Sequence, residues 1–109
     1  MALHPLTDDL SLDARVADGD LLVAYFSTPT CGVCQVLRPQ VDAMLDRLGI
    51  PGVFIDTTAL PQTAAQRLVF AVPSILVYAD GREQQRVGRH LSLQALEDSL
   101  TRLQELMAP

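Results

Sequence analysis

The sequence predicts an α/β domain built on a mixed β-sheet. A strand–helix–strand unit occupies the first half of the chain, and such a unit joins parallel strands by a right-handed crossover. A tight-turn signal follows in the second half and joins antiparallel strands. An amphipathic helix then ends the chain. The 109 residues, 49% of them apolar, suffice for one domain with its own core. We therefore expect a single domain over residues 1–109.

The first half of the chain supplies the strand–helix–strand unit. Residues 1–19 are expected to be an irregular or helical segment. Leu21–Ser27 is a continuous apolar, β-prone run, typical of a buried central strand. Cys31–Leu48 predicts a helix that Gly49 ends, because its apolar residues recur every three or four positions. Val53–Asp56 predicts the second strand, parallel to the first.

The second half supplies the antiparallel part of the sheet. Pro61–Phe70 predicts a short helix that opens on proline. Ile75–Ala79 and Glu83–Gly88 predict two strands joined by the hairpin turn Asp80-Gly81. The second of these is polar, which is typical of an edge strand. Ser92 is expected to cap the last helix, whose apolar face is a row of leucines: Leu93, Leu96, Leu100, Leu103 and Leu106.

Charge and composition exclude several functions. The formal net charge is −5 and all eight cations are arginines, so nucleic acid and anionic membranes are poor partners. The absence of lysine excludes Schiff-base chemistry through that residue. The longest wholly apolar run, Leu21–Phe26, is too short to span a bilayer. Met1–Leu10 lacks the charged and apolar regions of a signal peptide. A cytoplasmic location is therefore expected, with reduced cysteines.

Cys31-Gly32-Val33-Cys34 lies between the first strand and the helix. A structural disulfide across so small a loop would remove little chain entropy. A zinc site would need more ligands, and neither His4 nor His90 has the spacing for one, so no metal is expected. Two incidental core cysteines are a further alternative. A redox dithiol is favoured, because free N–H groups and the helix dipole stabilise a thiolate at a helix N-terminus.

The helix also predicts different roles for the two cysteines. Cys31 lies at the open end of the helix, whereas Cys34 continues its buried face. We therefore expect Cys31 to be the exposed nucleophile. Cys34 is expected to be the resolving thiol, which attacks the mixed disulfide and releases the product.

Several short motifs together indicate one protein family. They are the strand Leu21–Phe26, Cys31-Gly32-Val33-Cys34, Pro39, Phe54-Ile55-Asp56, Val72-Pro73-Ser74, Asp80-Gly81 and Val87-Gly88. With them, the sequence resembles the thioredoxin family over most of its length. The resemblance implies a thioredoxin-like fold, a central mixed sheet flanked by helices on both faces. It also implies that Pro73 is cis and packs against the dithiol.

The resemblance implies a function as well. The chain would be a cytoplasmic thiol–disulfide oxidoreductase that serves cell redox homeostasis by reducing or exchanging disulfides of protein substrates. It would need no cofactor beyond the redox-active Cys31–Cys34 disulfide. A reductase or a small thiol would supply electrons. Substrate would bind along a surface made of two groups of residues: Gly32 and Val33, and Val72, Pro73 and Gly88.

The sequence also departs from the family pattern. Thr30 replaces the usual tryptophan before the first cysteine, and Val33 replaces the usual proline of the motif. Tyr25 stands at the position of a buried aspartate that accepts the proton of the second cysteine. Its hydroxyl would either donate to a sulfur or turn to water. Arg89 is expected to face the dithiol and favour the Cys31 thiolate. Thr30, Tyr25 and Arg89 are therefore possible tuning residues.

These departures keep a second hypothesis open. The domain would then be a peptide-binding module, with the cysteine pair acting as a redox switch or playing no catalytic role.

Overall fold

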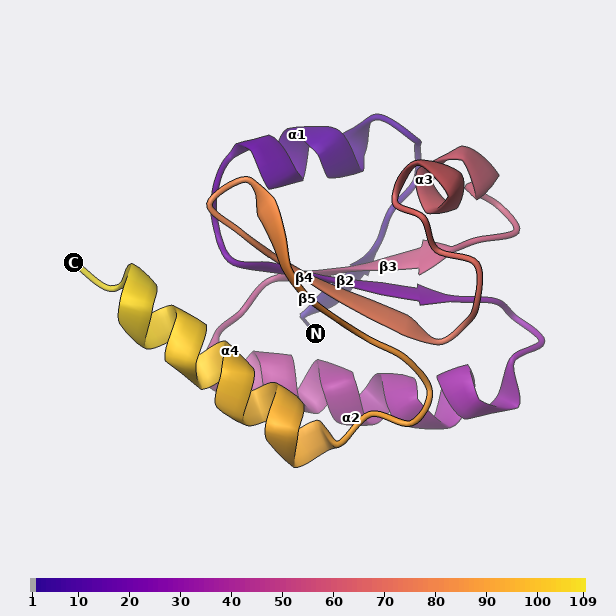
Figure 1. Cartoon of the computed structure of the whole chain (residues 1–109). Coiled ribbons are helices and arrows are strands. Elements are labelled where there is room, and N and C mark those ends of the chain that lie inside the picture. The colour runs from indigo at the N-terminus through magenta and orange to yellow at the C-terminus, as the bar shows by residue number, and fades with distance from the viewer. Residues whose placement is uncertain (1) are drawn as a thin grey trace.

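The computed structural model describes residues 2–109, and from the strand that begins at Leu22 onward its helices and strands follow the predicted order (Figure 1). In order they are β1 (Leu3–Pro5), α1 (Ser11–Ala17), β2 (Leu22–Ser27), α2 (Gly32–Leu48), β3 (Gly52–Asp56), α3 (Pro61–Gln66), β4 (Ser74–Ala79), β5 (Arg82–Val87) and α4 (Leu93–Met107). None of the described helices is both long and apolar enough to cross a membrane.

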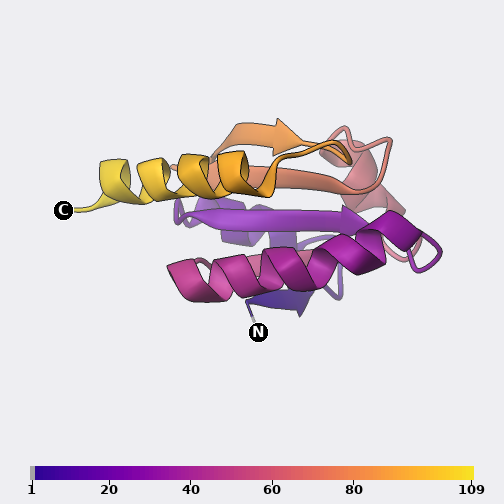
Figure 2. The same ribbon diagram turned by 90° about the horizontal axis from the view of Figure 1, so that it is seen from below.

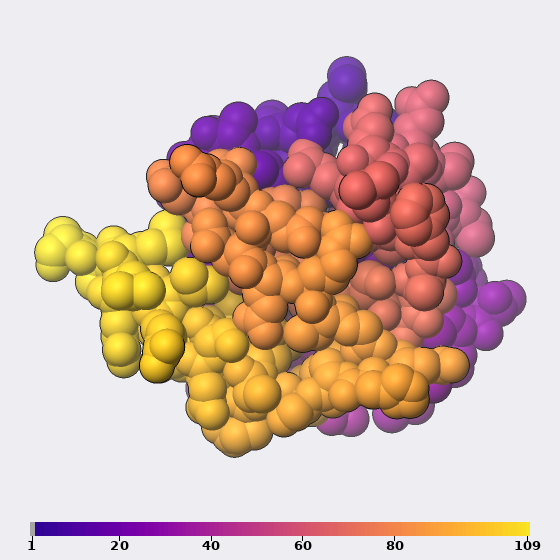
Figure 3. Space-filling view, in the orientation of Figure 1, coloured from indigo at the N-terminus to yellow at the C-terminus, as the bar shows by residue number. Residues whose placement is uncertain are grey.

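The strands form a mixed sheet in the order β1-β3-β2-β4-β5, which confirms the predicted architecture. β1 and β2 both run parallel to β3, whereas β4 is antiparallel to β2 and β5. Every residue of β2 is buried, as expected of a central strand. β5 is the polar edge strand and lies at the surface in Figure 3.

Helices cover both faces of the sheet, with α1 and α3 on one face and α2 and α4 on the other (Figures 1 and 2). Side chains alternate between faces along a strand. Leu22, Ala24 and Phe26 of β2 therefore pack in the cluster under α1 and α3, and Val23 and Tyr25 pack in the cluster under α2 and α4. Each face of the sheet thus has its own apolar core.

The predicted turn and cap residues have the expected backbone. Gly49 ends α2 with φ +71°, a left-handed conformation that glycine adopts without strain. Asp80 and Gly81 both have positive φ, as the two-residue hairpin between β4 and β5 requires. The Ser92 hydroxyl accepts a hydrogen bond from the Ala95 N–H and caps α4.

Two elements differ from the prediction. Residues 1–19 were expected to be irregular or helical, and they do contain α1. They also contain the strand β1 over Leu3–Pro5, which was not predicted. The Leu3 N–H holds this strand in place by donating to Asp42 Oδ1 at 2.8 Å. The helix predicted over Pro61–Phe70 ends at Gln66, because Leu68 has φ +57° and cannot continue it. Phe70 beyond it is 84% exposed.

Arg86 of β5 holds the loop that contains this left-handed residue. Its guanidinium donates to the carbonyl oxygens of Arg67 at 2.6 Å and Leu68 at 2.7 Å, and to the Glu83 carboxylate at 2.8 Å. We expect Arg86→Ala to lower the free energy of unfolding by about 1–2 kcal/mol, since these partners lose a charged donor. Urea denaturation measures the change. The exposed Arg82, replaced by alanine, is the matched control and should cost less than about 0.5 kcal/mol. Equal losses in the two variants would contradict the role of Arg86.

Candidate active site

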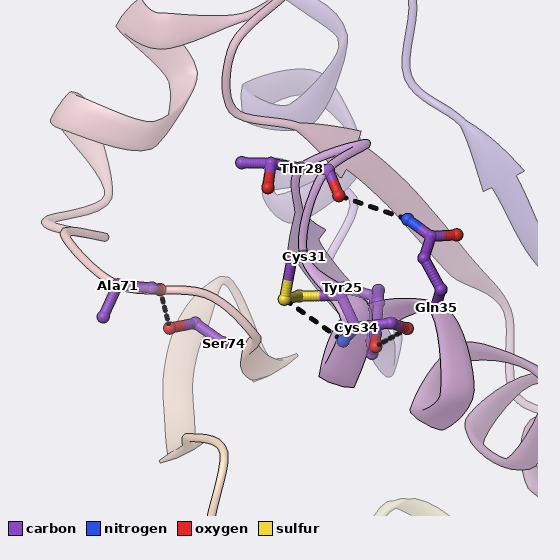
Figure 4. The surroundings of a disulfide bond; sticks show 7 residues. All are labelled: Tyr25, Thr28, Cys31, Cys34, Gln35, Ala71 and Ser74. Carbon is purple, nitrogen blue, oxygen red and sulfur yellow. Dashed lines mark hydrogen bonds between the residues drawn. A yellow bond between two sulfur atoms is a disulfide. The ribbon is translucent and has the colours of Figure 1, made fainter.

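The cysteine pair is held at the start of α2, directly after β2. Cys31 is the N-cap of the helix, and its sulfur forms a disulfide with Cys34 (Figure 4). The Cα atoms of the two cysteines are 5.2 Å apart. The Thr28 carbonyl oxygen accepts from the Cys31 N–H at 3.2 Å and from Gln35 Nε2 at 3.1 Å. These bonds fix the loop between β2 and the motif.

The two cysteines differ in exposure. Cys31 is partly exposed, whereas Cys34 is 1% exposed. The Cys34 N–H donates to Cys31 Sγ at 3.2 Å. In the reduced protein the same N–H and the positive end of the helix dipole would stabilise a thiolate on Cys31. The exposures favour the predicted roles, with Cys31 as nucleophile and Cys34 as resolving thiol.

The predicted substrate surface is assembled from three segments. The Val72–Pro73 peptide bond is cis, which confirms that prediction, and Pro73 is buried. Ser74 Oγ donates to the Ala71 carbonyl oxygen at 2.7 Å, and Figure 4 shows this segment beside the disulfide. A Cβ on Gly88 would lie 3.9 Å from the Pro73 carbonyl oxygen, so β5 ends next to Pro73. Substrate binding by these residues stays a prediction.

Tyr25 lies fully buried under α2, and its hydroxyl does neither of the two things expected of it. It donates to the Cys34 carbonyl oxygen at 2.7 Å, rather than to a sulfur or to water (Figure 4). Burial raises the pKa of Tyr25 to about 12, and the nearby Arg38 charge opposes the rise. A phenol with this pKa stays neutral at physiological pH and cannot act there as the base for Cys34.

Arg38 is a component of the site that sequence reasoning missed. Its guanidinium carbon lies 3.7 Å from the centroid of the Phe54 ring, a cation–π contact. The Phe54 ring stacks on Tyr25 at 6.3 Å between centroids. A cation therefore lies near the position where the family pattern has an acid. The available signal was the spacing, since Arg38 follows Cys34 by four residues on the same side of the helix.

The other candidate residues are placed as follows. Thr30 is exposed beside the motif. Arg89 lines a groove together with Gly32 and Val33 of the motif, and its expected effect on the Cys31 thiolate stays a prediction. His4 and His90 are both exposed, and residues 2–109 contain no cluster of side chains suited to a metal ion.

The buried hydroxyl of Tyr25 gives the stability a defined pH dependence. Its pKa rises from 10.0 to about 12 on folding, and a pKa difference of one is worth about 1.4 kcal/mol. The neutral Tyr25 hydroxyl therefore contributes its full stabilisation of the folded state below pH 10, and this contribution is lost as the pH rises through the folded-state pKa of about 12. We expect the free energy of unfolding to fall by up to about 3 kcal/mol through this window. Denaturation of the protein and of Tyr25→Phe at a series of pH values measures the difference.

Burial also raises the pKa of Tyr78, so both proteins should lose stability at alkaline pH. The contribution of Tyr25 is the stability that the unsubstituted protein loses at alkaline pH beyond the loss seen in Tyr25→Phe. Parallel curves for the two proteins would contradict the prediction.

Comparisons with known proteins place the chain among thioredoxins. A family model described as Thioredoxin matches residues 4–102. The chain is 34% identical over 105 residues to "Thioredoxin-like protein YdfQ" of Bacillus subtilis, covering 95% of this chain and 91% of that protein. It is 28% identical over 104 residues to a thioredoxin of Mycolicibacterium smegmatis, covering 87% and 92% respectively.

Solved structures share the fold. A mutant thioredoxin from Halobacterium salinarum superposes with a TM-score of 0.86 at 26% identity, over 98% of this chain and 94% of that one. The oxidised form of mitochondrial thioredoxin 3 from Saccharomyces cerevisiae superposes with a TM-score of 0.81 at 22% identity, over 92% and 94%.

Proposed function

Since this chain belongs to the thioredoxin family, we propose that it reduces or exchanges disulfides of protein substrates in the cytoplasm. Family membership and the Cys31–Cys34 disulfide support thiol–disulfide oxidoreductase activity. Thioredoxins need no cofactor beyond that disulfide. Family members are generally reduced by a reductase, and here the donor is proposed to be a reductase or a small thiol. The cytoplasmic location expected from the sequence stays a prediction.

The reaction moves two electrons in two exchange steps. The Cys31 thiolate attacks one sulfur of the substrate disulfide, and the other substrate sulfur leaves as a thiolate that takes a proton. Cys34 then loses its proton and attacks the Cys31 sulfur of the mixed disulfide. The second substrate thiol is released, and the Cys31–Cys34 disulfide forms. The substrate has gained two electrons and two protons, and a dithiol reductant returns the protein to its starting state.

The difference in exposure between the two cysteines carries this proposal. A substrate disulfide can approach Cys31, which is partly exposed at the helix end. Cys34 is 1% exposed and lies at disulfide distance from Cys31, so it can attack only a partner already joined to Cys31. This geometry separates attack from resolution, as the two-step reaction requires.

Two measurements test the proposed function. With dithiothreitol as electron donor, the protein should accelerate the reduction of insulin disulfides. Its reduction potential should lie between roughly −270 and −200 mV, the range of thioredoxins and glutaredoxins. No acceleration, together with a potential below about −300 mV typical of structural disulfides, would contradict the proposal.

A peptide-binding module is the second candidate, and one observation favours it. At the position where the family pattern has a buried carboxylate, this site has the neutral Tyr25 hydroxyl, which donates to the Cys34 carbonyl oxygen. That hydroxyl cannot accept the Cys34 proton as a carboxylate would. A module would bind extended peptides equally well with Cys31 replaced by serine and would not turn over insulin. Peptide titration of Cys31→Ser beside the insulin assay distinguishes the two candidates.

A further inference from the structure

A groove of about 550 Å³ lies next to the dithiol, between the start of α2 and the segment that joins β5 to α4. Most of its side chains are apolar: Val33 and Val36 with Leu37 from α2, and Leu91 and Leu93 from the other wall. Val33 is 41% exposed and Val36 is 67% exposed. The groove thus offers apolar surface to a ligand that reaches the neighbouring Cys31.

Arg89 gives this groove a charge. It is exposed, and it is the only ionisable residue among the described residues that line the groove. Within residues 2–109, Arg47, Arg67 and Arg86 pair with acids. In the same range Arg89 has no acid partner, as is also true of Arg15, Arg38, Arg82 and Arg102, but of these five arginines only Arg89 lines the groove. The chain as a whole carries −5. The net negative charge disfavours an anionic ligand overall, whereas the unpaired Arg89 guanidinium attracts one to this groove.

We propose that this groove binds the substrate segment beside the target disulfide and selects segments that combine an apolar side chain with an aspartate or glutamate. The apolar side chain would bury surface against Val33 and Val36. The carboxylate would accept hydrogen bonds from the planar Arg89 guanidinium. The inference rests on the proposed function, because the segment is delivered to Cys31 for exchange. Arg89 is then a specificity-determining residue.

Rates of exchange with matched peptides test the selection. Each peptide carries one cysteine joined to the same small thiol, a nearby leucine, and either glutamate or lysine beside it. The reduced protein should react with the glutamate peptide about three to ten times faster at low salt, and the ratio should shrink at high salt. Arg89→Ala should abolish this preference and Arg89→Glu should reverse it. A peptide with serine in place of leucine should react more slowly, and Val36→Ser should remove that difference.

Arg82→Ala is the matched control. Arg82 is an exposed arginine at the hairpin end of β5, away from Gly88, and Arg82→Ala changes the net charge by the same amount as Arg89→Ala. It should leave the ratio between the two peptides unchanged. A glutamate preference that survives Arg89→Glu would overturn the proposal.

A binding titration separates this inference from the proposed function. The peptides are made again with serine in place of their cysteine and titrated against the oxidised protein by NMR. Glutamate-selective shifts that depend on Arg89 support the groove even if no exchange occurs, an outcome that would contradict only the proposed function. If the glutamate and lysine peptides bind equally well to the unsubstituted protein, and again equally well to Arg89→Glu, the inference that the groove selects acidic segments is overturned.

Discussion

Replacing Cys31 by serine is expected to reduce the insulin-reduction rate to that of dithiothreitol alone. Cys31 is the partly exposed cysteine of the pair, and its position as N-cap of α2 provides the N–H and dipole that stabilise a thiolate. A hydroxyl at this position is not a nucleophile at neutral pH without an activating base. Replacing Cys34 should stop the reaction after its first step instead, leaving the substrate joined to Cys31.

The stalled intermediate is measurable directly. Cys34→Ser, mixed with a disulfide substrate, should accumulate a covalent complex on non-reducing gels, and mass spectrometry should place the bond at Cys31. The same variant identifies physiological substrates by trapping. The variant with both cysteines replaced is the control and should trap nothing. Continued turnover by Cys34→Ser, or faster alkylation of Cys34 than of Cys31 in the reduced protein, would contradict the assigned roles.

The central elements were predictable because their signals are local and repeated. A run of apolar residues predicted a strand over Leu21–Ser27, and the structure has β2 over Leu22–Ser27. The helical periodicity predicted Cys31–Leu48, and α2 begins only one residue later. β1 has three residues, too few for a pattern, and it exists because Leu3 packs in the core and the strand pairs with the distant β3.

The candidate site divides in the same way. The spacing of the cysteines and the helical periodicity predicted that Cys31 lies at the open end of the helix and that Cys34 is buried, and the structure has Cys31 as the N-cap and Cys34 buried. The Tyr25 bond to the Cys34 carbonyl oxygen and the Arg38 contact with Phe54 were missed. Both depend on how closely α2 packs on β2 and β3, which side-chain periodicity does not determine.

Tyr25→Asp is expected to change both the pKa of Cys31 and the rates of the two exchange steps. It places a carboxylate where the tyrosine is now fully buried, below Cys34. A negative charge there disfavours a second one nearby, so the pKa of Cys31 should rise. In the unsubstituted protein we expect a Cys31 pKa below the free-cysteine value of about 8.5. The carboxylate would also accept the Cys34 proton, so attack should slow and resolution should speed up.

The pH dependence of alkylation of the reduced protein measures the pKa of Cys31, and Tyr25→Asn is the matched control. Asparagine has the shape of aspartate without its charge. Both variants should lose about 3–5 kcal/mol of stability from the missing ring, and aspartate should lose more because its charge is buried. Only aspartate should raise the Cys31 pKa. If neither variant folds, the unsubstituted protein and Tyr25→Phe still report the pKa. Equal values for aspartate and asparagine would contradict the charge argument. A Cys31 pKa at or above about 8.5 in the unsubstituted protein would remove the activated nucleophile and favour the peptide-binding module.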